Sequence, residues 1–202
     1  MMHLEHLRKD KKLRTIIDLQ QPHTLVRRKQ VWLHLCASIM SQQLSTKVAD
    51  VIYNRFLNLF PKRKPTLNLV IHMPFETLRG IGLSNAKTNY VKNVCEFFLK
   101  ENITDSKLYK MENEEAIKYL TQIKGVGQWT VEMILMFTLG REDILALDDL
   151  GIQQSMIKLY KIKAANKKEL REKMEKHSAK WSPYRTYASR YLWGWKDNVP
   201  VT

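Results

Sequence analysis

The sequence is poor in cysteine and has no long apolar segment, and these two absences exclude several protein classes. Cys36 and Cys95 are the only cysteines in 202 residues, too few for a disulfide framework and without a partner at metal-ligand spacing. We expect both to be buried free thiols in a reducing compartment. The longest apolar run, Met133–Leu139, is too short to cross a bilayer, and no segment of signal-peptide type is present. These absences predict a cytoplasmic protein without a membrane partner.

Acidic residues are scarce relative to basic ones. Thirty-four Lys and Arg against twenty Asp and Glu give a net charge of +14 and a pI near 9.8. A field of this sign attracts polyanions and accelerates encounters with them. Lysines that merely solvate the surface are the alternative, so the charge predicts a nucleic acid or another acidic partner without choosing between them.

Alternation of period two is also missing, whereas helical spacing recurs along the chain, so the pattern predicts an all-α fold. The Lys-rich residues before Leu13 are expected to be loosely ordered. Four residues are expected to serve as helix N-caps: Ser45, Ser84, Asn113 and Ser182. In the last helix four aromatic residues share one face and are assigned to the core: Tyr184, Tyr187, Tyr191 and Trp195. Trp193 lies on the opposite face.

The stretch from Leu120 to Gly151 is the most informative part of the sequence. It turns through Gly125-Val126-Gly127, enters an apolar helix that ends at Gly140, and then presents Asp148 and Asp149 before another helix. Taken alone, the glycines favour helix capping, and a turn that offers the first amides of the next helix to a phosphate is the alternative. A weaker repeat of this plan occurs at Gly80-Ile81-Gly82, followed by Lys87.

The segments GVGQWTVEMILMFTLGR and LALDDLG together resemble the signature of the helix-hairpin-helix DNA glycosylases, in particular the alkyladenine branch of DNA-3-methyladenine glycosylase II type. The likeness extends from about Val31 to Trp195. It implies a single glycosylase unit over residues 1–202, with two helical lobes and a DNA-binding cleft. Residues 31–140 would form a central lobe that carries the hairpin at 120–130. Residues 1–30 and 141–202 would form a second lobe from both chain ends.

The resemblance implies a monofunctional DNA glycosylase that flips out and hydrolyses alkylated purines of the 3-methyladenine and 7-methylguanine type. Asp149 matches the catalytic aspartate, and Asp148 is interpreted as a helix N-cap. Trp129, Trp193 and Met133 match the base pocket, with core packing as the alternative for Trp129. Relatives that also cleave the strand carry a lysine at the Trp129 position, so the resemblance implies no lyase step. It implies no organic cofactor, and an iron–sulfur loop would need four cysteines.

The resemblance also assigns the DNA contacts of a monomer bound to double-stranded DNA with alkylated bases. The backbone would be bound by the hairpin residues Gly125, Val126, Gly127 and Gln128. The weaker repeat, rather than the resemblance, adds Lys87 as a backbone contact, with packing alone as the alternative. Gln43 or Leu44 would fill the space of the flipped base, although a capped helix–helix turn is the alternative there. The main-chain carbonyls of Thr121, Ile123 and Val126 would hold a structural Na⁺ or K⁺. A non-catalytic helix-hairpin-helix DNA-binding module is the other functional reading, and Asp149 with Trp129 and Trp193 argues against it.

Overall fold

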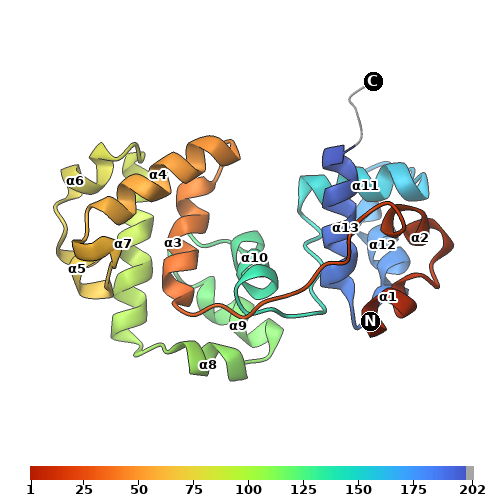
Figure 1. Cartoon of the computed structure of the whole chain (residues 1–202), viewed down its shortest axis with the longest axis horizontal. Helices are drawn as coiled ribbons and strands as arrows, with labels where there is room; N and C mark the ends of the chain where they lie inside the picture. The colour runs from red at the N-terminus through yellow and green to blue at the C-terminus, as the bar shows by residue number, and fades with distance from the viewer. Residues whose placement is uncertain (199–202) are drawn as a thin grey trace. The chain divides into compact units, whose positions relative to one another are not determined.

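The structure, a computed structural model, describes residues 1–198 and is entirely helical over that range. This confirms the predicted all-α class. The chain divides into two compact units, a central unit of Arg28–Ile134 and a terminal unit of Met1–Arg27 with Leu135 onward. Both are visible in Figure 1. Within residues 1–198 no helix is long and apolar enough to cross a bilayer.

The central unit is built around its longest helix, α7 (Asn85–Lys100), which packs against α3 (Val31–Ser41), α5 (Leu67–His72) and α6 (Phe75–Gly80). Its other elements are α4 (Thr46–Asn58), η1 (Pro61–Arg63), α8 (Asp105–Lys110), α9 (Asn113–Leu120) and the start of α10 (Gln128–Phe137). Val91, Val94 and Phe98 of α7 are buried. The two cysteines are buried free thiols, as predicted, and burial is the main cause of the raised pKa of Cys36.

The terminal unit joins both chain ends around α13 (Arg185–Asn198), which packs against α11 (Leu150–Tyr160) and α2 (Lys11–Ile17) (Figure 1). It also contains α1 (Met2–Leu7), α12 (Lys167–Ser178) and η2 (Ala179–Trp181). The Ser155 hydroxyl donates to Leu192 O at 3.0 Å and ties α11 to α13. The expectation of a loosely ordered start was wrong, because α1 buries Leu7 and the Asp10 side chain caps α2.

Helix caps were predicted with mixed success. Ser84 caps α7, its hydroxyl accepting from the Lys87 N–H at 3.3 Å. Ser45 lies at the predicted position but makes no side-chain capping bond. Glu112, rather than Asn113, precedes α9. Ser182 follows η2, and its hydroxyl donates to Asp143 instead of capping α13, which begins at Arg185.

The aromatic face of α13 was predicted correctly in part. Tyr187 and Tyr191 are buried, whereas Tyr184 and Trp195 are only half-buried. The ring of Trp195 instead carries the Lys158 ammonium 5.2 Å from its centroid. Tyr184 precedes the first residue of α13, and Trp195 lies in its last turn.

Candidate active site

The turn between α9 and α10 depends on glycine at position 125. Gly125 has φ +102°, which L side chains rarely adopt, and a Cβ there would overlap the ring of Tyr90. The Val126 N–H donates to Ile123 O at 2.9 Å, and the Asn93 amide donates to Lys124 O at 3.0 Å. A Cβ on Gly127 would meet nothing within 4 Å. The first N–H groups of α10 therefore lie at the positive end of the helix dipole. No side chain at position 127 covers the backbone there, so a ligand can approach it.

The loop between α3 and α4 carries Gln43 in a left-handed conformation, with φ 59°. This conformation is uncommon for a residue other than glycine. Gln43 is exposed, and Leu44 is 37% exposed. The Leu44 N–H donates to Ser41 O at 3.1 Å and closes the turn. Both predicted wedge residues are thus presented to solvent on a tight turn.

Lys87 of α7 binds the main chain of this loop. Its ammonium donates to Met40 O at 3.0 Å and to Gln42 O at 2.6 Å, and burial lowers its pKa. The Gln42 amide in turn donates to the Thr130 hydroxyl of α10 at 3.4 Å. Lys87 therefore holds the C-terminal end of α3, a role that the sequence did not predict. Its contact with a DNA phosphate stays a prediction.

One face of α10 is left partly exposed. Six residues from Thr130 to Met136 are buried, whereas Trp129, Met133 and Phe137 are not. These three are spaced four residues apart and so lie on one side of the helix. Trp129 and Met133 were predicted to line a base pocket, and Phe137, at 39% exposure, was not.

Asp149 is the N-cap of α11, in place of Asp148. Its Oδ1 accepts the Ile152 N–H at 2.8 Å and the indole N–H of Trp193, also at 2.8 Å. The carboxylate is half-buried and is held by one backbone and one aromatic donor. Asp148 is exposed and pairs with Arg171 at 3.3 Å. The expectation that Asp148 caps the helix was wrong, because the backbone turn begins one residue later.

Trp193 reaches Asp149 across a glycine. A Cβ on Gly151 would lie 3.0 Å from Trp193 Cδ1 and 3.1 Å from Asp149 Oδ1, so a larger residue would press on both groups. The ring of Phe137 lies 5.6 Å from that of Trp193, tilted by 38°. The Arg190 guanidinium is 6.0 Å from the centroid of Phe137. The terminal unit therefore assembles a carboxylate, an indole, a phenyl ring and a cation at the start of α11.

The sequence-predicted residues fall into groups according to the unit that holds them. Asp149 and Trp193 are in direct contact in the terminal unit. The hairpin, Trp129, Met133, Lys87 and the Gln43 loop belong to the central unit. Sequence reasoning missed Phe137 and Gly151. Phe137 could have been found from its spacing of eight residues from Trp129, and Gly151 from its position two residues after the proposed catalytic acid.

Known proteins are similar to this chain in sequence and in fold. The family model for the HhH-GPD superfamily base excision DNA repair protein matches residues 36–180. DNA-3-methyladenine glycosylase 1 of Schizosaccharomyces pombe is 35% identical over 185 residues, which cover 91% of this chain and 80% of that protein. The structure of S. pombe 3-methyladenine DNA glycosylase (Mag1) in complex with abasic DNA matches with a TM-score of 0.86 at 32% identity, covering 100% of both chains. A DNA-3-methyladenine glycosidase from Bacillus halodurans matches with a TM-score of 0.82 at 33% identity, covering 96% of this chain and 88% of that one.

Proposed function

The chain belongs to the HhH-GPD superfamily of base excision DNA repair proteins, and on that premise we propose that it is a monofunctional DNA glycosylase that excises alkylated purines from duplex DNA. The observation that carries the proposal is the Asp149 carboxylate, fixed at the start of α11 by the Ile152 N–H and the Trp193 indole. Such a pair of donors sets the orientation of the carboxylate before substrate arrives.

Asp149 supplies the negative charge that this reaction needs. Cleavage of an N-glycosidic bond passes through a sugar that resembles an oxocarbenium ion, and a nearby carboxylate stabilises that positive charge and orients the attacking water. A purine alkylated at N3 or N7 is already cationic and leaves without a general acid. One oriented carboxylate is therefore enough for 3-methyladenine or 7-methylguanine.

The target base must leave the duplex stack to reach Asp149 and needs an aromatic surface to receive it. Trp193, with Phe137 beside it, and the stripe of Trp129 and Met133 on α10 supply apolar and aromatic groups of this kind. The face of an indole attracts a cation more than a neutral ring of the same shape. This preference favours alkylated, positively charged bases over normal ones.

Trp129 also bears on the fate of the DNA strand. A lyase reaction would need an amine that attacks the sugar to form a Schiff base. An indole occupies the hairpin position at which the strand-cleaving relatives are expected to carry that lysine. The product is therefore an abasic site in an intact strand.

The hairpin and the Gln43 loop are assigned to DNA binding. The open amides at the start of α10 would bind backbone phosphates. Gln43, on its tight left-handed turn, or Leu44 would fill the gap left by the flipped base, and strained loop residues of this kind are concentrated at functional sites. Ile123 O accepts one hydrogen bond in the turn; with Thr121 O and Val126 O it would hold a monovalent cation through carbonyl oxygens alone. The protein would act as a monomer.

Two readouts of one incubation test the proposal. Duplex DNA treated with a methylating agent is mixed with the protein, and the released bases are separated by chromatography while the strands are run on a denaturing gel without alkali or heat. We expect free 3-methyladenine or 7-methylguanine and uncut strands. DNA binding without base release would favour the non-catalytic module, and a borohydride-trapped covalent complex would contradict the monofunctional assignment.

A further inference from the structure

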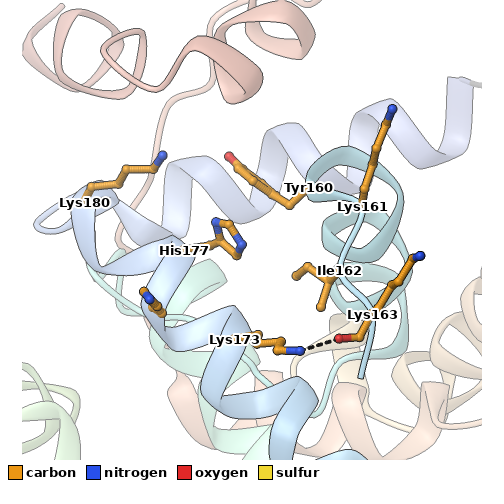
Figure 2. A pocket seen from close by; sticks show the side chains of 8 residues that line it. Tyr160, Lys161, Ile162, Lys163, Lys173, His177 and Lys180 are labelled. Carbon is orange, nitrogen blue, oxygen red and sulfur yellow. Dashed lines mark hydrogen bonds between the residues drawn. The ribbon is translucent and has the colours of Figure 1, made fainter. Parts of the chain in front are cut away.

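The far end of α11 carries a concave site in the terminal unit. A pocket of about 540 Å³ lies there, lined by Tyr160, Ile162 and His177 together with a group of lysines: Lys161, Lys163, Lys173, Lys176 and Lys180. Figure 2 shows the His177 ring beside that of Tyr160, with the lysines around them; the ring centroids are 4.6 Å apart. A neighbouring pocket shares Tyr160, His177 and Lys180 and adds Asp10 and three lysines of the N-terminal segment. We call the first of these the lysine pocket.

The walls of the lysine pocket are fixed by the buried carboxylate of Asp10. Its Oδ2 accepts the Tyr160 hydroxyl at 2.5 Å, the Trp181 indole N–H at 3.0 Å and the Lys180 ammonium at 3.0 Å. Its Oδ1 accepts the N–H groups of Lys12 and Leu13. One side chain thereby joins α2, the end of α11 and η2, and it fixes Tyr160 and Lys180 of the pocket wall.

The charge of the lysine pocket is not neutralised by its own carboxylates. Lys173 pairs with Glu169 and Lys180 with Asp10. Among the residues that the structure describes, no ion pair involves Lys161, Lys163 or Lys176. Burial, followed by the charges of Lys180 and Lys12, lowers the pKa of His177. A ligand that enters this site meets several ammonium groups and brings its own negative charge.

The lysine pocket is separate from the candidate active site. Asp149 precedes the first residue of α11, and Tyr160 is the last of its 11 residues. At 1.5 Å per residue the two ends of the helix are roughly 16 Å apart. A nucleotide held at Asp149 therefore does not reach the lysine pocket.

We propose that the lysine pocket binds a small, multiply charged phosphate compound, either inorganic polyphosphate or a nucleotide with a phosphate chain. Its volume falls within the roughly 300–1,000 Å³ of sites for small molecules. Lysine binds phosphate as a point charge, whereas arginine binds carboxylate or phosphate in a planar, bidentate geometry. The cations that line this pocket are lysines, so recognition here rests on charge. The Tyr160 and His177 rings and Ile162 form a less polar wall that suits a short chain of phosphates or the sugar next to it.

Calorimetric titration of the whole protein in 0.15 M salt tests the proposal, with tripolyphosphate and ATP as the two probes. We expect one site per chain for tripolyphosphate. The triple variant Lys161→Gln, Lys163→Gln, Lys176→Gln should bind it about tenfold more weakly or worse, because charge-assisted contacts are lost. Equal affinity for both probes identifies polyphosphate as the ligand class, and tighter binding of ATP identifies a nucleotide.

A matched variant with the same change in net charge separates the pocket from the general positive field. This control removes three exposed lysines of the central unit: Lys64→Gln, Lys110→Gln and Lys118→Gln. Its affinity for tripolyphosphate should stay within twofold of the wild type, because salt screens charges that are far from the pocket. Equal weakening in both triple variants, or no binding of either probe, overturns the proposal. It is also overturned if the pocket variant loses affinity for undamaged duplex DNA while it binds tripolyphosphate normally, since the face would then be a DNA contact.

Discussion

The aspartates at the two ends of α11 are held in opposite ways. Asp10, at the C-terminal end, is 6% exposed, and both its oxygens accept hydrogen bonds from groups of three different elements. Asp149, at the N-terminal end, is half-buried, and its Oδ1 is fixed by a backbone amide and an indole. The first carboxylate is enclosed by the protein that it joins together. The second is oriented but still reached by solvent, which is the condition for acting on a substrate.

Asp149→Asn should give the largest effect and test the catalytic side of this comparison. Asparagine caps a helix as well as aspartate does, so the unfolding temperature should hardly change. Base release should fall by about 10³-fold or more, since the charge acts on the transition state. Single-turnover release of 7-methylguanine and a thermal melt measure the two properties. Asp148→Asn is the matched control, and the assignment is wrong if that variant is the inactive one.

Asp10→Asn should have the reverse outcome. We expect a loss of about 2–3 kcal/mol in the free energy of unfolding, the scale of a buried hydrogen bond to a charged group, with base release retained at a temperature where the variant is folded. Denaturant titration measures the loss. An Asp10→Asn protein as stable as the wild type would show that the charge of Asp10 at the end of α11 contributes nothing to stability.

Acid should weaken the same contacts of Asp10 in the wild-type protein. Burial alone would raise the pKa of Asp10, but hydrogen bonds from Trp181, Tyr160 and Lys180 outweigh it and lower the pKa from 3.8. The stabilisation is therefore complete above about pH 3.8 and is lost as the pH falls through the lowered value. Below that pH the stability of Asp10→Asn should fall less steeply than that of the wild type. If the free energy of unfolding depends on pH in the same way in both proteins, Asp10 is not the source of this stabilisation.

Trp193→Phe should show whether the indole orients Asp149 or only receives the base. Phenylalanine keeps an aromatic ring and loses the N–H donor, so we expect roughly a tenfold loss in the rate of base release, about the value of one hydrogen bond to a charged group. Trp195→Phe is the control on the same helix, since its ring contacts Lys158 instead. Equal rates in the two variants would mean that the hydrogen bond to Asp149 contributes nothing.

Gly151→Ala should produce the smallest change. Its Cβ would press on Trp193 and Asp149, and displacement by a few tenths of an ångström should reduce base release about threefold. Alanine favours the helix over glycine, so stability should be unchanged or higher. Gly80→Ala, where a Cβ meets nothing within 4 Å, is the control. Loss of activity together with loss of stability would indicate a general packing defect.

The sequence predicted the all-α fold, the buried thiols and the cap at Ser84 because these depend on local pattern. It misplaced a cap where two aspartates are adjacent, at Asp148 and Asp149, since either side chain can cap a helix and tertiary packing chooses the first helical residue. Contacts between residues that lie far apart in the sequence could not be predicted. Asp10 meets Tyr160 150 positions later and Trp181 171 positions later, and no spacing rule connects them.

The same limit applies to the candidate site. Trp193 was identified by its place on the polar side of the last helix, but its bond to Asp149 joins residues 44 positions apart. Lys87 was assigned to DNA because it follows a second glycine turn of hairpin type, with packing alone as the alternative. Its actual partners lie 45 and 47 positions earlier, and only the packing of α7 on α3 brings them within reach.

The contact between Gly125 and Tyr90 constrains how this hairpin can evolve. The ring of Tyr90 fills the space that a Cβ would need, and the positive φ of Gly125 disfavours any L side chain even without the ring. A smaller residue at position 90 would therefore leave a gap but would not permit alanine at position 125. The constraint at this turn is one-sided: replacing the tyrosine costs packing alone, whereas the glycine is fixed for as long as the turn is kept.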